Sequence, residues 1–430
     1  MKSNSLRPLL AVSFGNALEF YDFTVYAFFA IQIGQAFFPS HDPQISLLAS
    51  FATFGAGFLT RPLGAVIIGR MGDRQGRGPA LALSMVLMGL AIAMLVLCPG
   101  YERIGIAAPL VALASRLLQG FALGGEAGPA TAYMLEAAPL HRRGLFVAVQ
   151  RATQLLANLV GAILGAVLAA VLSPEAFTSY GWRIAIGLGA LVAPYALYLR
   201  RNLPEPPFRE TEVHSAATPA VPPGTWRMVL CCTLVGAGGT VSAYVLNYLT
   251  TYGQADLHLP TSATFAGQAT SCLGGMASLV AGAMISDRIG RRAMIVAGNL
   301  LAAVLVPLVF VALLGAPGVV SFVLAATAVG ALLNFPTAAV ITISTESFPH
   351  HVRSLATALA YTVPVTLFGG TTQFAVVWLI RLTGSTMVPA LYAAGALLLS
   401  SLALVLLRET APARRGDLPN PGQAPLGRNA

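Results

Sequence analysis

The chain is 430 residues long, with 56% hydrophobic residues, only 10% charged residues and a formal net charge of +9. A soluble domain usually carries about a quarter charged residues, so this chain has too little charge to cover a water-exposed surface. The composition excludes ordinary soluble enzymes, disordered chains and secreted disulfide scaffolds, and it indicates a protein that lies largely in lipid.

Charge-poor runs long enough to cross a bilayer recur along the whole chain. A transmembrane helix needs about 20 mostly apolar residues, and twelve runs meet this requirement. They are expected near 9–38, 45–69, 79–98, 106–136, 144–172, 182–199, 227–252, 262–285, 293–314, 318–346, 353–381 and 387–407. Several exceed the minimum, so we expect kinks or extensions past the bilayer.

The positive charges are distributed unevenly between the two sides that twelve spans would create. With the N-terminus inside, 19 of the 25 Lys and Arg residues fall in inside segments. Of the remaining six, Arg103, Arg183 and Arg381 lie at outside ends, and Arg61, Arg116 and Arg151 lie within spans. This asymmetry satisfies the positive-inside rule and predicts that both termini are cytoplasmic. The charge therefore needs no nucleic acid to explain it.

Neither a cleavable signal nor a metal site is expected. The first run is long and carries Glu19 and Asp22 instead of a plain hydrophobic stretch with a cleavage site. The four cysteines lie in or beside apolar runs without metal-ligand spacing. No nucleophile–base pattern stands out, so we predict no catalytic residues, no enzyme activity and no cofactor.

The chain is organised as two similar halves. We predict an N-terminal six-helix half (1–199), a polar cytoplasmic linker (200–226), a C-terminal six-helix half (227–408) and a cytoplasmic tail (409–430). Asp73 and Asp287 lie in matching loops 214 positions apart, and Glu136 and Glu346 follow matching spans 210 positions apart. Parallel repeats of this kind put a binding site between the halves, near the bilayer midplane.

Short motifs carry a resemblance to a known family. The loops Gly69–Arg77 and Ser286–Arg292 look like the signature of the major facilitator superfamily. Further pieces resemble its metabolite:proton symporter branch, most of all the citrate and tricarballylate symporters, with 2-oxoglutarate carriers next: Gly15–Phe23, Gly57–Gly64, Arg116–Phe121, Gly124–Glu126 and Phe368–Gly370. The resemblance implies twelve transmembrane helices in two six-helix repeats, a bacterial inner membrane, and alternating access.

Two acids in the first span are predicted to couple transport to protons. Glu19 and Asp22 lie one helical turn apart, with Tyr26 a further turn along the same face. Tyr26 is predicted to contribute to the substrate-binding site. Ionisable groups at membrane depth are costly, and each is a functional candidate. The alternative is that either acid pairs permanently with an arginine.

Two arginines within spans are predicted to bind the substrate. Arg116 shares a helix face with Gln119, and Arg151 begins a stripe with Gln154 and Asn158. A guanidinium binds a carboxylate bidentately, so two arginines facing one cavity suit a di- or tricarboxylate such as citrate or tricarballylate. Alternatively, Arg116 is tied to Glu126 or Asp22. In the citrate transporters a small hydroxyl residue is the pattern at the position of Arg151, which leaves the acid open.

The C-terminal half has no charge at mid-membrane depth. We expect its contribution to the binding site to come from hydroxyl and amide groups, namely Tyr244, Tyr248, Asn334 and Tyr361. Tyrosines near span ends are often only interface anchors.

Charges at the cytoplasmic ends of the helices are predicted to control which side is open. This gating set comprises Arg61, Asp73, Arg74, Arg77, Glu136, Asp287, Arg288 and Glu346. The predicted function is proton-coupled symport of a small organic anion by a monomer in the lipid bilayer, with no nucleic-acid partner. The alternatives are 2-oxoglutarate or a zwitterion such as proline or betaine as substrate, sodium coupling, and a channel.

Overall fold

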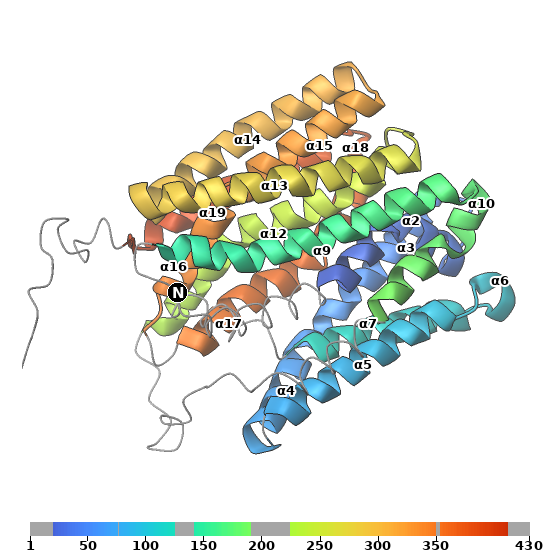
Figure 1. Ribbon diagram of the computed structural model, residues 1–430, viewed down its shortest axis with the longest axis horizontal. Helices are drawn as coiled ribbons and strands as arrows, with labels where there is room; N and C mark the ends of the chain where they lie inside the picture. Colours follow the sequence, from blue (N-terminus) through green and yellow to red (C-terminus); the bar gives the residue numbers. More distant parts are fainter. Residues whose placement is uncertain (1–19, 76, 125–141, 191–223, 350–352, 412–430) are drawn as a thin grey trace, which may run out of the picture.

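The computed structural model describes residues 20–75, 77–124, 142–190, 224–349 and 353–411 (Figure 1). Every regular element within these ranges is a helix, which confirms the predicted all-α class. Glu19, Glu136 and all but the last three residues of the predicted linker 200–226 lie outside the described residues. The side chains of Asp73, Arg74 and Arg77 also lie outside the description.

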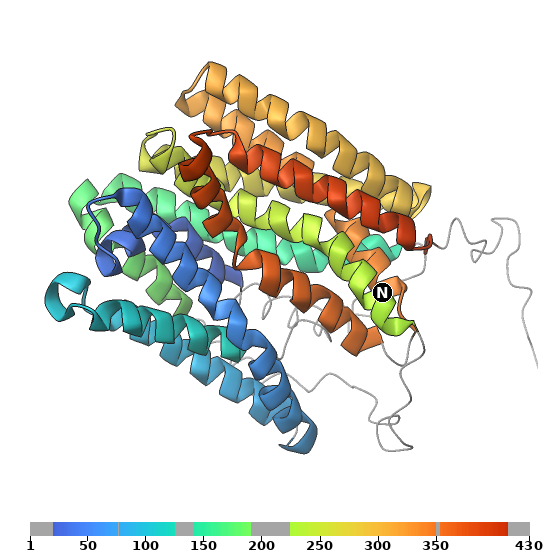
Figure 2. The same ribbon diagram turned by 180° about the vertical axis from the view of Figure 1, so that it is seen from behind.

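The described helices before residue 191 form the first bundle (Figures 1 and 2). The first of them covers residues 20–28, and the last covers residues 182–190. Between them lie α2 (Ala30–Phe37), α3 (Pro43–Ala56), the 3₁₀ helix η2 (Gly57–Thr60), α4 (Arg61–Gln75), α5 (Arg77–Leu97), α6 (Tyr101–Ile104), α7 (Ala107–Leu123), α9 (Arg143–Val171), α10 (Pro174–Ala176) and the π-helix η4 (Phe177–Gly181).

The described helices after residue 223 form the second bundle (Figures 1 and 2). They are α12 (Thr225–Ala255), α13 (Thr261–Ile289), α14 (Arg291–Gly315), α15 (Val319–Asn334), α16 (Thr337–Glu346), α17 (Arg353–Pro364), the π-helix η7 (Val365–Gly369), α18 (Thr372–Thr383), α19 (Val388–Ala403) and the 3₁₀ helix η8 (Leu404–Leu406).

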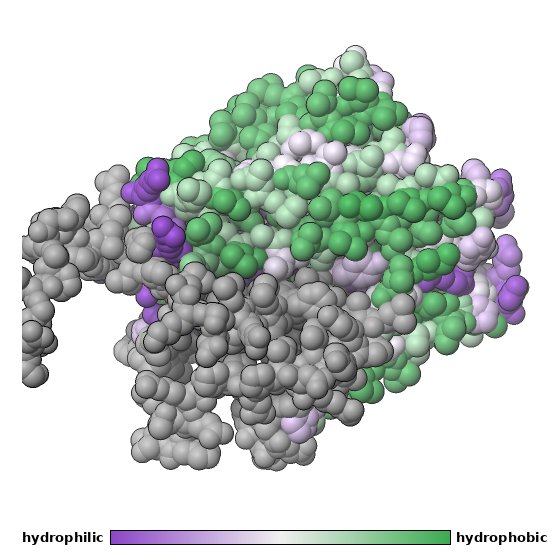
Figure 3. All heavy atoms as spheres, viewed as in Figure 1, coloured by the Kyte–Doolittle hydropathy of each residue, from purple (hydrophilic) through white to green (hydrophobic). Residues whose placement is uncertain are grey.

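The lengths and the surface of these helices confirm a multi-pass membrane protein. Among the described residues, eight helical segments are long and apolar enough to cross a membrane, and Leu83–Leu97 and Ala107–Leu123 are shorter apolar helices. The first and sixth predicted spans are described only in part, as the helices 20–28 and 182–190. Figure 3 shows an apolar surface over α13 and α14, with hydrophilic residues gathered at the two ends.

Glycine contacts give the predicted repeat a physical basis. Gly120 on α7 lies against the carbonyl oxygen of Gly57, and Gly330 on α15 lies against the carbonyl oxygen of Ser271. Gly120 and Gly330 are 210 positions apart, and Gly57 and Ser271 are 214 positions apart. These are the offsets of the repeated sequence motifs. In lipid, small residues let helix backbones approach closely, so both bundles use the same helix crossing.

The helices are interrupted where the bundles meet. Pro336 separates α15 from α16, and η7 follows Pro364 directly. Proline lacks the N–H group that a helix requires. Beyond η7, Gly370 lies against the backbone of Gly55 on α3, and a side chain at Gly55 would meet the carbonyl oxygen of Gly370 at 2.5 Å. The two bundles also pack along α9 and α13, which lie side by side (Figure 1).

Candidate functional site

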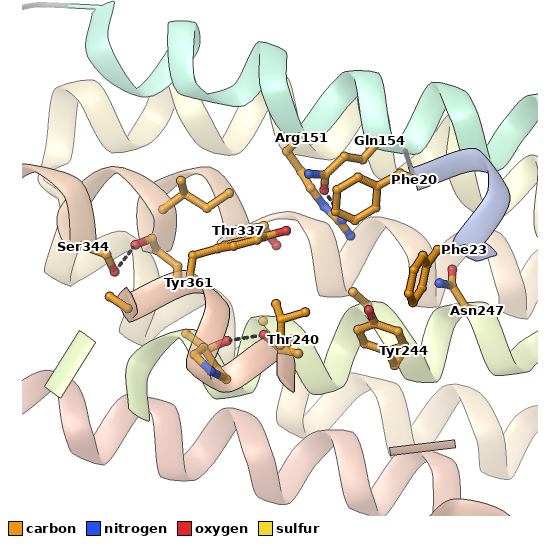
Figure 4. A pocket seen from close by; sticks show the side chains of 18 of the residues that line it. Phe20, Phe23, Arg151, Gln154, Thr240, Tyr244, Asn247, Thr337, Ser344 and Tyr361 are labelled. Carbon is orange, nitrogen blue, oxygen red and sulfur yellow. Dashed lines mark hydrogen bonds between the residues drawn. The ribbon is translucent and has the colours of Figure 1, made fainter. Parts of the chain in front are cut away.

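A cavity of about 110 Å³ lies between the two bundles. The first bundle contributes residues of 20–28, α3 and α9, and the second contributes residues of α12, α16, α17 and η7. Figure 4 shows Arg151 pointing into this space, with Tyr361 and Thr337 across from it and Phe20 beside it. This cavity lies at the interface of the halves, where the sequence repeat predicts a binding site.

Arg151 is held in the cavity by neutral partners. Its Nη1 donates to Gln154 Oε1 at 2.8 Å, and its Nη2 donates to Asn334 Oδ1 on α15 at 3.4 Å. Its Nε has no hydrogen-bond partner among the described residues. Amide oxygens accept hydrogen bonds without neutralising the positive charge. Within the described part of the chain, no acidic side chain forms an ion pair with this guanidinium. Its positive charge at the bundle interface suits an anion.

A second polar link joins the bundles about two helical turns further along α9. Asn158 accepts a hydrogen bond from the Thr24 hydroxyl at 2.8 Å and donates to Asn247 Oδ1 at 3.3 Å. A small polar cavity of about 10 Å³ lies behind it and is also lined by Gln268. That volume is enough for about one water molecule. The predicted stripe of Arg151, Gln154 and Asn158 thus faces the interface as a unit.

A layer of aromatic rings closes one end of the cavity. Phe54 and Phe58 of the first bundle lie 6.2 and 5.9 Å from the ring of Tyr244 in the second. Phe23 completes the layer at 5.5 Å from Phe54. Edge-to-face rings at these separations attract one another. Phe54, Phe23 and Tyr244 line the cavity, so this layer is both its floor and a contact between the bundles.

Arg116 lies outside the cavity lining, behind this aromatic layer. Its guanidinium stacks 4.1 Å from the ring centre of Tyr26, and Tyr26 stacks 5.6 Å from Phe54. Asp22 interacts electrostatically with Arg116 from within the same bundle. All three residues and Gln119 are buried. The two arginines predicted to share a cavity therefore occupy different environments.

The buried charges Asp22 and Arg116 make no side-chain hydrogen bonds within the part of the chain that the structure describes. No side-chain nitrogen or oxygen of Asp22, Arg116 or Gln119 has a hydrogen-bond partner among the described residues. Leaving such groups unpaired in the interior costs free energy, and proteins rarely tolerate it away from functional sites. This cluster is therefore a candidate for proton binding in its own right.

Three of the four wall residues predicted in the second half line a cavity, and one does not. Tyr244 and Tyr361 line the cavity, and Asn334 lines the small cavity behind it. Tyr248 is not among the lining residues; its hydroxyl donates to Asp256 Oδ2 at 3.0 Å, at the end of α12. Burial raises the pKa of Asp256 to about 6, although the Tyr248 hydrogen bond and nearby His258 act in the opposite direction.

Asp287 bridges the bundles at one end of the molecule. The backbone N–H groups of Gly144 and Leu145, in the first turn of α9, donate to its carboxylate at 3.1 and 3.3 Å. An acid at a helix N-terminus is favoured by the helix dipole. The same carboxylate pairs with Arg291 at 2.5 Å. The predicted neighbour Arg288 is exposed.

Glu346 is the second acid at this end. It lies 3.5 Å from Arg291 Nε and 3.8 Å from Arg143 of the first bundle, and the Thr410 hydroxyl donates to it at 2.7 Å. Asp287 and Glu346 thus share the buried Arg291 and each contact α9. Arg61, also predicted as a gating residue, is buried over the rings of Phe23 and Phe58.

The opposite end also carries contacts between the bundles. Asp42 Oδ2 forms an ion pair with Arg381 Nη2 at 2.9 Å, and Gln32 Nε2 donates a hydrogen bond to Gln254 Oε1 at 3.3 Å. We refer to these two ends as the Asp42 end and the Asp287 end.

Comparison with known proteins identifies the family. A family description, the Major Facilitator Superfamily, matches residues 12–363. The chain belongs to this superfamily. Its members are membrane transporters, so this chain is a transporter and not an enzyme.

Several characterised relatives are similar over most of their length. A citrate-proton symporter from Salmonella typhi is 33% identical and covers 90% of each chain. An alpha-ketoglutarate permease from Escherichia coli is 33% identical over 85% of each chain. A proline/betaine transporter from Escherichia coli is 29% identical over 94% of this chain and 84% of its own.

The fold likeness extends to solved structures. The xylose transporter XylE from Escherichia coli, in a partially occluded inward-open conformation, matches 94% of this chain and 97% of its own. The TM-score is 0.73 at 17% sequence identity. This likeness supports the superfamily fold and carries no information about the substrate of this chain.

Hydrophobic periodicity does not identify several residues of this transporter's cavity. Phe20, Phe23 and Phe54 line it, yet a phenylalanine within an apolar run looks the same whether it faces lipid or a cavity. Arg291 joins Asp287 to Glu346, but it lies beside two other arginines, Arg288 and Arg292, from which composition alone does not distinguish it. Its place at the start of α14, four residues after Asp287, was the available signal.

Proposed function

We propose that this chain is a proton-coupled symporter of a small organic acid and that Arg151 binds the carboxylate of its substrate. One observation supports this above the others: the Arg151 guanidinium enters the cavity between the bundles, and the partners it has there are the neutral amides Gln154 and Asn334. A carboxylate offers charge neutralisation and a bidentate fit that amides do not.

Exchange of partners on Arg151 gives the substrate a means to act on both bundles. Gln154 belongs to the first bundle and Asn334 to the second. A carboxylate that takes Nη2 replaces the Asn334 contact, so binding changes a contact between the halves. A ligand shifts a conformational equilibrium only through such differential interactions.

The proposed proton site is Asp22, paired electrostatically with Arg116. Protonation of Asp22 would remove the compensating charge from Arg116, which stacks on Tyr26, and Tyr26 stacks on the cavity residue Phe54. This chain of contacts offers a physical route from proton binding to the aromatic layer. Sodium as the coupling ion is the alternative that the test below separates.

The proposed gate at the Asp287 end consists of Asp287, Glu346 and their partners on α9. The positive-inside asymmetry of the sequence supports a cytoplasmic location for this end, and the bacterial relatives support an inner membrane. Opening on this side would separate Asp287 from the N-terminus of α9. Arg61 is proposed to position the aromatic rings of Phe23 and Phe58, over which it lies.

The test is uptake into proteoliposomes that contain the full-length chain. With an inside-alkaline pH gradient, a labelled organic acid from a panel of citrate, tricarballylate, 2-oxoglutarate and benzoate should accumulate faster than in protein-free liposomes, which benzoic acid enters passively, and a protonophore should abolish the accumulation. Arg151→Gln should weaken this uptake about tenfold or more, the size of a lost charge-assisted hydrogen bond. Accumulation driven by sodium alone would refute proton coupling, and accumulation of betaine with no acid would refute the organic-acid proposal.

A further inference from the structure

We infer that the acid carried by this protein has its charge at one end and a flat, apolar body, as in an aromatic or cyclic monocarboxylate. This inference rests on the proposed function and narrows its substrate class. It departs from the tricarboxylates that two cavity-facing arginines predict. Three features of the cavity carry it: one accessible guanidinium, three wall hydroxyls that already donate to helix carbonyls, and aromatic rings from both bundles.

A single guanidinium reaches the cavity within the described part of the chain. Arg151 lines the cavity, whereas two stacked rings separate Arg116 from it. The Tyr26 ring lies 4.1 Å from the Arg116 guanidinium, and the Phe54 ring lies 5.6 Å from the Tyr26 ring. One planar guanidinium binds one carboxylate in its bidentate fork. A second and third carboxylate would be desolvated in the cavity without a cationic partner, which is costly.

Three hydroxyl groups of the wall are already engaged as donors, whereas Thr357 Oγ1 has no hydrogen-bond partner among the described residues. Thr240 donates to Gly236 O at 3.1 Å, Thr337 to Leu333 O at 3.1 Å, and Ser344 to Val340 O at 2.8 Å. A hydroxyl has one proton to donate, so binding a further carboxylate would break these helix contacts. The polar wall therefore tolerates a neutral body better than an additional anion.

Aromatic rings flank Arg151 on both sides of the bundle interface. Figure 4 shows Phe20, Phe23 and Tyr244 on one side of the guanidinium and Tyr361 on the other. Offset-stacked and edge-to-face ring contacts stabilise a flat partner beyond the area that it buries. A ring attached to the carboxylate would pack among these side chains while its charge meets Arg151. Phe20 and Tyr361 belong to different bundles, so such a body would contact both halves.

The experiment is calorimetric titration of the purified full-length chain with four probes: benzoate, cyclohexanecarboxylate, acetate and tricarballylate. Benzoate and cyclohexanecarboxylate should bind about tenfold more tightly than acetate, because burial of their rings adds apolar contact. Their affinities should exceed that of tricarballylate by a similar factor. Tricarballylate binding as tightly as benzoate would overturn the inference.

Ring variants test whether the cavity walls are responsible. Phe20→Leu and Tyr361→Leu should each weaken benzoate binding about fivefold or more and leave acetate within about twofold, since only the ring contact is lost. Phe374→Leu, at a half-exposed phenylalanine on α18 outside the cavity lining, is the matched control and should change neither. Equal weakening of benzoate and acetate would overturn the inference. The wild-type comparison stands even if a variant fails to fold.

The outcomes separate this inference from the proposed function. If tricarballylate binds as tightly as benzoate and its uptake is proton-coupled and depends on Arg151, the proposed function stands and this inference fails. If no acid binds or is accumulated, both fail.

Discussion

Asp22 and Arg116 are buried opposite charges in one bundle, and neither has a hydrogen-bond partner among the described residues. Asp22→Asn keeps the shape of the side chain but removes its titration. We expect this variant to retain exchange of acid across the membrane within about threefold, because Arg151 is untouched, and to lose uphill accumulation driven by a pH gradient. Exchange and accumulation are measured in the same proteoliposomes.

The control for this prediction is Glu102→Gln, which makes the same change at an exposed acid on α6. It should retain both activities. Accumulation by Asp22→Asn at the wild-type level would locate the coupling site elsewhere.

Asp256 makes thermal stability depend on pH. Its pKa is raised from 3.8 to about 6 by burial, so the folded protein binds this proton more tightly than the unfolded chain does. The stabilisation is complete below about pH 4 and is lost as the pH rises through about 6, to a total of about 3 kcal/mol. The titratable groups that interact with Asp256 are Tyr248, which hydrogen-bonds to it, and Tyr252 and His258, which interact with it electrostatically.

Asp256→Asn should therefore have the same melting temperature as the wild type near pH 4 and a higher one near pH 8. Melting curves of the detergent-solubilised proteins across this range measure the effect. Parallel pH profiles for the two proteins would contradict it.

Some site residues were predictable from sequence and others were not, for a physical reason. Arg151, Gln154 and Asn158 recur at helical spacing, and a polar stripe in an apolar run must face something other than lipid. The same reasoning predicted Arg116. Periodicity, however, shows only which face of the helix Arg116 lies on, and it does not show which side chain from another helix covers that arginine. The covering side chain is Tyr26, from a different helix.

At the scale of the helix, glycine contacts fix how closely the elements approach. Gly120→Ala would place a methyl group into the carbonyl oxygen of Gly57. Overpacking of this kind costs about 1–3 kcal/mol, so the melting temperature should fall. Gly395→Ala on α19 is the control, because nothing lies within 4 Å of its added Cβ. Equal melting temperatures for the two variants would show that the crossing tolerates a side chain.

The positions of the helices followed from the sequence, while their irregular turns did not. Long charge-poor runs predict spans directly, because a helix is the simplest way for a single segment to satisfy its backbone polar groups in lipid. Pro336 and Pro364 indicate a break, but the π-helix Val365–Gly369 depends on what packs against it. There, Tyr244 lies against Gly369, and Gly55 lies against Gly370.

At the scale of the whole molecule, contacts between the bundles lie on both sides of the cavity. Asp42–Arg381 and Gln32–Gln254 join them at one end, and Asp287 and Glu346 contact α9 at the other. Alternating access requires each set to break in turn. The internal repeat predicted a two-bundle architecture, but the residues that meet across it belong to different repeat units and needed the three-dimensional structure.

Joining the Asp42 end covalently should therefore stop transport. Cysteines replacing Gln32 and Gln254, in a chain whose four buried native cysteines are changed to serine or alanine, can be linked by a bifunctional thiol reagent with a reducible bridge. We expect linked protein to lose acid uptake and reduction of the bridge to restore it. The single Gln32→Cys variant should be unaffected by the reagent. Full uptake by the linked protein would contradict alternating opening at this end.

The most direct measurement of the central claim is a density map of the full-length chain with an aromatic monocarboxylate bound. The account predicts carboxylate oxygens within about 3 Å of the Arg151 guanidinium, the Asn334 contact replaced, and the ring between the two bundles near Phe20 and Tyr361. A carboxylate bound at Arg116, or an acid bound outside the cavity between the bundles, would contradict it.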